Sequence, residues 1–158
     1  MRWIIVSREE HPAPANVLDT GPYLERLPDL QSKLPTGARV FATDPDHYDF
    51  SGLRCVKDLK LIGITVREKG GAKLETVIEF GPNQFKHDVG LTITYTGVSD
   101  LRVSPKPGLS GKVWPATRRM GDLQLDEILP LDGGCSHEIA MTGGTIFVGC
   151  ADLVASWG

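Results

Sequence analysis

The sequence predicts a mainly β protein: an antiparallel sandwich or open barrel with one or two short helical turns near the N-terminus. Apolar residues alternate with a period of two after Arg39, the alternating runs are short, and 18 glycines and 11 prolines punctuate the chain. Short alternating runs bounded by turn residues are typical of antiparallel sheets. A chain of 158 residues has room for one hydrophobic core, so we expect a single domain over residues 1–158.

Residues 1–38 are expected to form a strand and a helical segment that pack on the sheet. The apolar run at residues 3–6 is predicted to be a short strand. Residues 20–34 are predicted to be helical, because Pro22 suits a first helical turn and leucines recur at spacings of three and four. Pro28 interrupts this pattern, so two short helical turns are an alternative to one helix.

The remainder of the chain is predicted to form strands separated by turns. The apolar runs expected to contain strands are residues 40–42, 53–66, 74–80, 91–95, 139–141 and 145–150. The run 91–95 is expected to continue to Val103, whereas the pattern of residues 123–129 is ambiguous. Gly143 and Gly144 predict the turn of a hairpin between the last two runs.

An Asp-Leu pair recurs three times near a break in the alternation, beginning at Asp58, Asp100 and Asp152. In one interpretation each pair marks a β-bulge, in which the leucine turns into the core and the aspartate accepts a freed backbone N–H. In the other interpretation the three pairs share a ligand site. We expect the bulge, because bulges are routine in antiparallel sheets.

Composition and charge argue against several classes of protein. The net charge is −3 and the 17 basic residues are scattered, so we expect no nucleic-acid partner. No segment approaches the roughly 20 apolar residues of a membrane span, and the apolar run at residues 3–6 is too short for a secretory signal. Cys55, Cys135 and Cys150 are odd in number and lack CxxC spacing. These features predict a soluble, cytoplasmic protein whose fold needs neither metal nor disulfide.

The densest polar cluster is the segment from Asp44 to Asp49, which also contains Asp46 and Tyr48. A calcium loop would need glycine at its sixth position and glutamate at its twelfth, and neither is present here. The cluster therefore fits either a solvated turn or an acidic contact surface. As a contact surface it would use Tyr48 and Phe50 as aromatic anchors, the kind of residue enriched at binding hot spots.

His87 and His137 each precede a carboxylate. Adjacent residues of a strand point to opposite faces, so neither pair forms an acid–base dyad by itself. If the two segments pair in space, Cys135 and Asp152 could join the histidines in a zinc set, but the spacing is not typical of zinc sites. The sequence also lacks a G-x-S-x-G motif and a phosphate loop. We therefore predict no catalytic residue, no metal ligand and no cofactor.

A second candidate contact patch contains Trp114 and Arg118. Both residues lie in a predicted loop that also holds Pro115 and Arg119. Trp and Arg are enriched at binding hot spots, whereas the alternative is a tryptophan laid over a sheet edge with solvated arginines.

The sequence resembles small β-rich bacterial proteins of unknown function. The resemblance lies in a His-Asp or His-Glu pair that is followed by an alternating strand and a closing Asp-Leu pair. The resemblance covers Leu53 to Leu153. It rests on the general pattern of residues rather than on a diagnostic motif, so no functional residue is transferred from it. Some proteins of that type are immunity proteins that neutralise toxins. The resemblance thus implies a binding protein, whose partner would be a basic toxin domain.

The expected function is that of a non-enzymatic protein-binding module. The predicted contact residues are Asp44, Asp46, Tyr48 and Asp49, with Trp114 and Arg118 as the second patch. The alternative is a small enzyme or small-molecule-binding protein with a pocket at the mouth of the sheet. In that case His47, His87 or His137 would act as acid or base.

Overall fold

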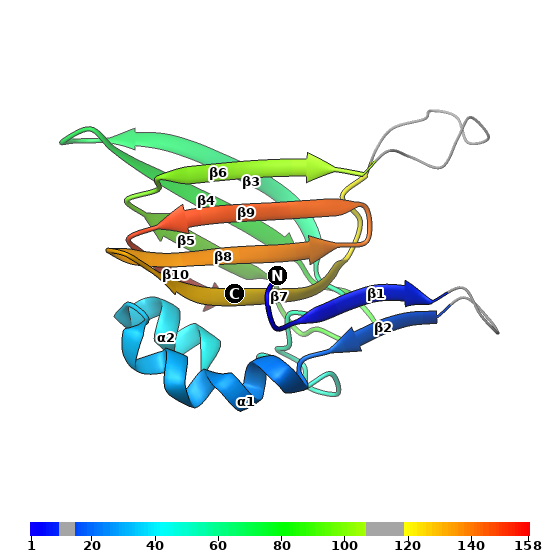
Figure 1. Ribbon diagram of the computed structural model, residues 1–158. Coiled ribbons are helices and arrows are strands. Elements are labelled where there is room, and N and C mark those ends of the chain that lie inside the picture. Colours follow the sequence, from blue (N-terminus) through cyan, green and yellow to red (C-terminus); the bar gives the residue numbers. More distant parts are fainter. Residues whose placement is uncertain (10–14, 107–118) are drawn as a thin grey trace.

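Two four-stranded antiparallel sheets pack face to face in the computed structural model, which describes residues 1–9, 15–106 and 119–158 (Figure 1). The first sheet has the strand order β10-β5-β4-β3 and the second the order β6-β9-β8-β7. The strands of the first sheet are β3 (Lys60–Lys69), β4 (Lys73–Gly81), β5 (Leu91–Thr96) and β10 (Asp152–Trp157). The strands of the second sheet are β6 (Asp100–Pro105), β7 (Leu123–Leu131), β8 (Gly134–Met141) and β9 (Gly144–Cys150). The predicted β-rich antiparallel fold is confirmed in its sandwich form.

The N-terminal part of the chain lies along one side of the sandwich (Figure 1). Its elements are β1 (Ile5–Glu9), β2 (Ala15–Asp19), α1 (Gly21–Leu30), a 3₁₀ turn η1 (Gln31–Lys33) and α2 (Thr36–Ala42). The helical prediction for residues 20–34 is confirmed as α1 followed by η1, with Pro28 inside α1. Helix α1 packs against β7 and α2 packs against β10. In the described residues no helix is long and apolar enough to cross a membrane.

The predicted strand at residues 40–42 is wrong, because these residues form the last turn of α2. Ala38, Phe41 and Ala42 are buried at helical spacing, whereas Val40 is 64% exposed. A short apolar run fits a strand or a helix, and the buried stripe here has the helical period. The run 53–66 is likewise a strand only from Lys60 onward.

The core is formed by the inward faces of both sheets. Burial alternates along β5, most of β4 and the first part of β9, whereas β8 is buried at most of its positions. The largest of these buried side chains are Ile78, Phe80, Leu91, Ile93, Tyr95, Ile139 and Met141. The ambiguous run 123–129 is strand β7, and the predicted hairpin is confirmed as β8 and β9.

Each Asp-Leu pair lies at or just before the start of a strand. Asp100 begins β6 and Asp152 begins β10, after crossings from one sheet to the other. The two crossings touch, because the Ala151 N–H donates to the Thr96 carbonyl oxygen at 2.9 Å. Within the described strands, register shifts occur in β3 and β7 rather than at these pairs, so the predicted bulges are wrong. The leucine expectation holds for Leu59 and Leu153, which are fully buried, whereas Leu101 is only partly buried. The expected aspartate contact holds for Asp152, whose carboxylate accepts backbone N–H groups.

A buried glutamate holds the N-terminal segment against the outer face of the second sheet. Glu127 is 1% exposed, and its carboxylate accepts the backbone N–H groups of Arg2, Trp3 and Ile4, the last at 2.8 Å. The guanidinium groups of Arg2 and Arg26 lie 5.0 and 5.3 Å from the centre of the Trp3 ring, within cation–π range.

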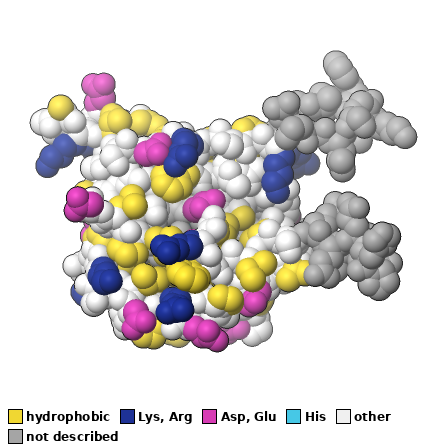
Figure 2. Space-filling view, viewed as in Figure 1, with side chains coloured by type: hydrophobic (Ala, Val, Ile, Leu, Met, Phe, Trp, Pro, Cys, Tyr) yellow, Lys and Arg dark blue, Asp and Glu magenta, His cyan; other side chains and the backbone are white. Residues whose placement is uncertain are grey.

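On the face drawn in Figure 2 the basic side chains are separated from one another rather than gathered in a tract.

Candidate functional site

The loop between α2 and β3 carries the predicted acidic contact residues. We call residues 44–49 the acidic loop. Asp46 and Asp49 are exposed and Asp44 is half-buried, whereas His47 and Tyr48 turn toward the core. The Asp44 carboxylate accepts the Asp46 N–H at 2.9 Å, which closes an Asx turn. The loop is therefore a hydrogen-bonded turn that also presents carboxylates at the surface.

His47 anchors the acidic loop through a hydrogen-bonded network that crosses the core. Its Nε2 lies 2.8 Å from Asp126 Oδ1 on β7, and Asp126 Oδ2 lies 2.7 Å from His137 Nε2 on β8. His137 Nδ1 then lies 2.8 Å from the hydroxyl of Tyr95 on β5 of the opposite sheet. We call His47, Asp126, His137 and Tyr95 the core network. All four are at most 1% exposed, so the loop is tied to both sheets through the interior.

One set of protonation states satisfies every polar atom of the core network. His47 Nδ1 lies 2.9 Å from the Phe41 carbonyl oxygen, which can only accept, so His47 donates from both nitrogens and is cationic. Ionised Asp126 accepts from His47 and His137, and neutral His137 accepts from the Tyr95 hydroxyl. The network then contains one positive and one negative charge, as a buried site requires.

Electrostatics support the charged forms of His47 and Asp126 and the neutral form of Tyr95. Burial alone would lower the pKa of His47, but the Asp126 carboxylate beside it raises that pKa overall. Burial alone would raise the pKa of the Asp126 carboxyl, but the two histidines hold it well below its usual range. Burial, reinforced by Asp126, raises the pKa of Tyr95 well above its ordinary value.

Aromatic packing fixes the rings around His47. The His47 ring centre lies 4.2 Å from those of Phe41 and Tyr48. The Tyr48 hydroxyl donates to the Asp126 carbonyl oxygen at 2.9 Å, so the polar tip of Tyr48 points inward. Tyr23 packs edge-on against Tyr48 at 5.8 Å. Tyr48 therefore lines the site, and its hydroxyl is hydrogen-bonded to the Asp126 carbonyl oxygen rather than free for a ligand.

We expect the core network to give this protein a stability that falls at alkaline pH. A group whose pKa is raised on folding stabilises the fold fully below its unfolded pKa, about 6.5 for histidine. That contribution is lost as the pH rises through the raised pKa of His47. The free energy of unfolding of the wild type should therefore decline above neutral pH relative to that of His47→Gln, as measured by urea denaturation. Parallel pH dependence of the two proteins in this range would show that His47 is not cationic.

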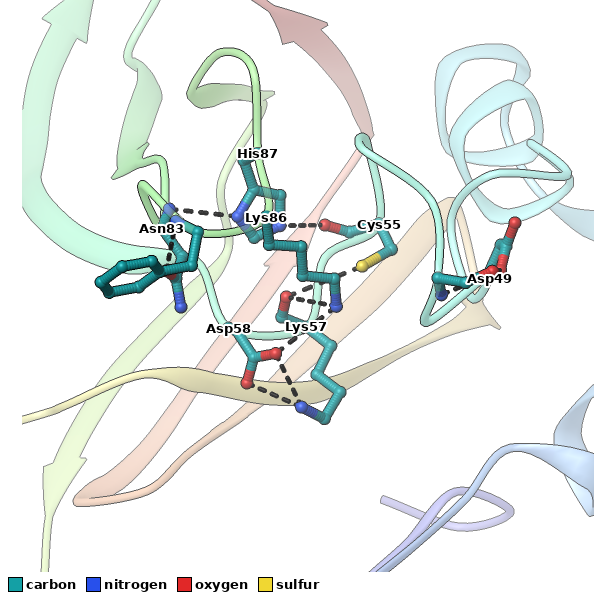
Figure 3. Close-up of polar contacts among 9 residues, drawn as sticks. Asp49, Cys55, Lys57, Asp58, Asn83, Lys86 and His87 are labelled. Carbon is teal, nitrogen blue, oxygen red and sulfur yellow. Dashed lines mark hydrogen bonds and ion pairs between the residues drawn. The ribbon is translucent and has the colours of Figure 1, made fainter.

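A second anchor joins residues 53–58 to the segment between β4 and β5 (Figure 3). His87 Nε2 donates to the Cys55 carbonyl oxygen at 3.0 Å, and His87 Nδ1 accepts the Asn83 N–H at 3.1 Å. Burial lowers the pKa of His87, which favours this neutral form. Nearby, Asp58 pairs with Lys57 at 2.7 Å and with Lys86 at 3.4 Å. These contacts hold the part of the α2–β3 connection that follows the acidic loop.

The residues of the possible zinc set do not converge. His137 belongs to the core network, whereas His87 bonds to the loops. Cys135 contacts Cys150, and Asp152 accepts the N–H groups at the start of α2, which caps that helix. Among residues 1–9, 15–106 and 119–158, no three His, Cys, Asp or Glu side chains are arranged to hold a metal ion.

Two pockets adjoin the acidic loop. The first, of about 270 Å³, is lined by Leu24 and Leu27 of α1 and by Asp44, Pro45, Tyr48 and Asp49 of the loop, among others. The second, of about 240 Å³, lies between α2 and β10 and is lined by Val40, Phe41, Asp44, Val154 and Trp157, among others. Asp44 lines both pockets. Asp44 is therefore shared by two pockets whose other lining residues are mostly apolar.

The structure brings together part of the predicted contact set. Asp44, Tyr48 and Asp49 line a pocket, and Asp46 lies beside them on the same turn. Trp114 and Arg118 lie outside the described residues. The sequence did not indicate that exposed side chains of α2 and β10, at Val40 and Val154, belong to the same surface. Their only sequence signal is that they are apolar.

The three histidines of the enzymatic alternative are all withdrawn from solvent. His47 and His137 are 1% and 0% exposed, and His87 is 7% exposed. Both ring nitrogens of each are within hydrogen-bond distance of protein atoms.

Comparison with known proteins gives no match to a family model, a curated protein or a solved structure.

Proposed function

We propose that this chain is a protein-binding module whose contact surface is the acidic loop together with its two flanking pockets. The observation that supports this proposal is that Asp44 lines both pockets, so that charge and apolar recesses occupy one continuous surface. Aromatic and apolar anchors in pockets, beside a charged group, are the usual composition of a binding hot spot.

The charge of the surface favours a basic partner. Within the described part of the chain, Asp44, Asp46 and Asp49 form no ion pair with a Lys, Arg or His side chain. Hydrogen bonds from Ser51 lower the pKa of Asp49, which keeps it ionised. Exposed carboxylates attract a basic surface over about a Debye length and speed its association.

The size of the pockets favours protein side chains over a larger small molecule. Sites for drug-sized ligands typically measure about 300–1,000 Å³. The two pockets here measure about 270 and 240 Å³ and are separate. Each suits a single apolar side chain of a partner, with a Lys or Arg between them facing Asp44.

The loop is fixed before any partner binds, which lowers the entropic cost of binding. His47 holds the acidic loop from the core network, and His87 holds Cys55 farther along the connection between α2 and β3. In its most specific form, we propose that this is a cytoplasmic bacterial protein of the immunity type that neutralises a basic toxin domain. That form is supported by the acidic surface and by the resemblance in sequence. The withdrawn histidines favour a binding module over a small enzyme.

A pocket variant tests this proposal. Wild-type protein is used to capture a partner from an extract of its native cells, and the affinity of the isolated partner is then measured for two variants. Val40→Gln should weaken binding about tenfold or more, because it places an amide at the rim of the second pocket. Val66→Gln is the matched control, since Val66 is also exposed but lies on β3 and lines neither pocket. Equal affinities of the two variants would contradict the proposed surface.

A further inference from the structure

Two cysteine thiols face each other in the second sheet. Cys135 of β8 is directly opposite Cys150 of β9 in the strand register, and their sulfur atoms are 3.6 Å apart. Both are free thiols, and they are 0% and 4% exposed. Neither takes part in the proposed contact surface.

We propose that Cys135 and Cys150 form a reversible intrachain disulfide. Opposite residues of antiparallel strands have Cα atoms about 4.5–5.5 Å apart, within the roughly 4.4–6.8 Å that a disulfide requires. The sulfur atoms must move from 3.6 Å to a bonding distance of about 2.05 Å, which side-chain rotation can supply. The β-hairpin already aligns the two strands, so the backbone keeps its register.

The pair lies at one end of the β8–β9 hairpin. Cys150 is the last residue of β9, and Cys135 is the second residue of β8, beside the turn at Asp132 and Gly133. A Cβ at Gly134 would overlap the Cys150 carbonyl oxygen, so only backbone fits between that turn and Cys150. In this proposal the strand end opens locally to admit the oxidant, because local opening costs less free energy than global unfolding.

Cys150 is suited to react first. Cys150 is the more accessible of the two. The hydrogen bond between the two thiols lowers the pKa of Cys150 and raises that of Cys135. The thiolate is the reactive form of cysteine, so Cys150 is the attacking group and Cys135 the resolving group.

Oxidised glutathione supplies a balanced reaction. The Cys150 thiolate attacks one sulfur of the glutathione disulfide, forming a mixed disulfide and releasing one glutathione thiolate. Cys135 then loses its proton and attacks the Cys150 sulfur, which forms the intrachain bond and releases the second glutathione. Two protein thiols are oxidised, one glutathione disulfide is reduced, and the two thiol protons end on the two released glutathione molecules.

The Cys55→Ser variant tests the proposal most cleanly, because it leaves only the two facing thiols. Native protein is incubated with oxidised glutathione, quenched with acid, unfolded, alkylated with iodoacetamide and weighed by mass spectrometry. We expect the variant monomer to lose two hydrogen atoms and take no alkyl group, and wild type to take one, at Cys55. Dithiothreitol before quenching should restore every thiol.

Several outcomes would overturn the proposal. They are two alkyl groups on the Cys55→Ser variant, a persistent glutathione adduct, and a disulfide-linked dimer. Wild type provides the same test without any substitution, through peptide mapping of its disulfide. A bond from Cys55 to either of the other cysteines would also refute the assigned pair.

Discussion

Asp126→Asn should lower the free energy of unfolding by about 3–5 kcal/mol, because it removes one member of a buried ion pair. Asparagine keeps the volume of aspartate and can still accept one hydrogen bond, so the loss reports on charge rather than on packing. His47 would then either hold an uncompensated charge in the core or lose its proton and a donor. Urea denaturation near pH 6 measures the difference.

Asp88→Asn is the matched control for this prediction. Asp88 is exposed and pairs with Arg54 at 3.5 Å on the surface, where an ion pair contributes about 0–1 kcal/mol. We expect the control to differ little from the wild type. Equal destabilisation by the two substitutions would contradict the charged assignment of the core network.

Much of the fold could be predicted from local pattern because one face of each sheet is buried. Strands β4 and β5 alternate apolar and polar residues, and both lie where the sequence predicts strands. The strand prediction was wrong where apolar residues are buried in turns rather than in a sheet. Cys55, Val56 and Leu59 are fully buried within turns at the end of the sandwich, so the apolar run 53–66 is longer than its strand.

The predicted continuation of β5 to Val103 was also wrong. The chain leaves the first sheet at Thr96 and enters the second at Asp100. Gly97 has a φ of +61°, a left-handed conformation that glycine adopts readily, and this reverses the path of the chain. Sequence alternation is the same on both sides of the crossing, so period alone could not separate the two strands.

The core network could not be predicted because its members are far apart in the chain. His47 is 79 residues from Asp126, and Tyr95 is 42 residues from His137. One signal was present: Asp126 and His137 occupy inward positions of β7 and β8, and the neighbouring inward positions, such as Ile128 and Ile139, are apolar. A polar residue at an inward position needs a buried partner, but the sequence does not name that partner.

Reversing two charges of the acidic loop should have the largest effect on binding. In the double variant Asp46→Lys, Asp49→Lys, the association rate with the captured partner should fall on the order of tenfold or more at low salt. Both residues are exposed, so the free energy of unfolding should change by no more than about 0.5 kcal/mol. The double variant Glu68→Lys, Asp132→Lys changes the net charge equally at exposed positions that line neither pocket, which controls for total charge.

The salt dependence of the association rate is the most direct test of an acidic docking surface. Stopped-flow or surface-based kinetics would compare the wild type and both double variants at low and at high ionic strength. We predict that the rate falls with salt for the wild type and the control, and that the acidic-loop variant loses most of that dependence. An unchanged low-salt association rate in the acidic-loop variant would contradict the account and leave residues 44–49 as a solvated turn.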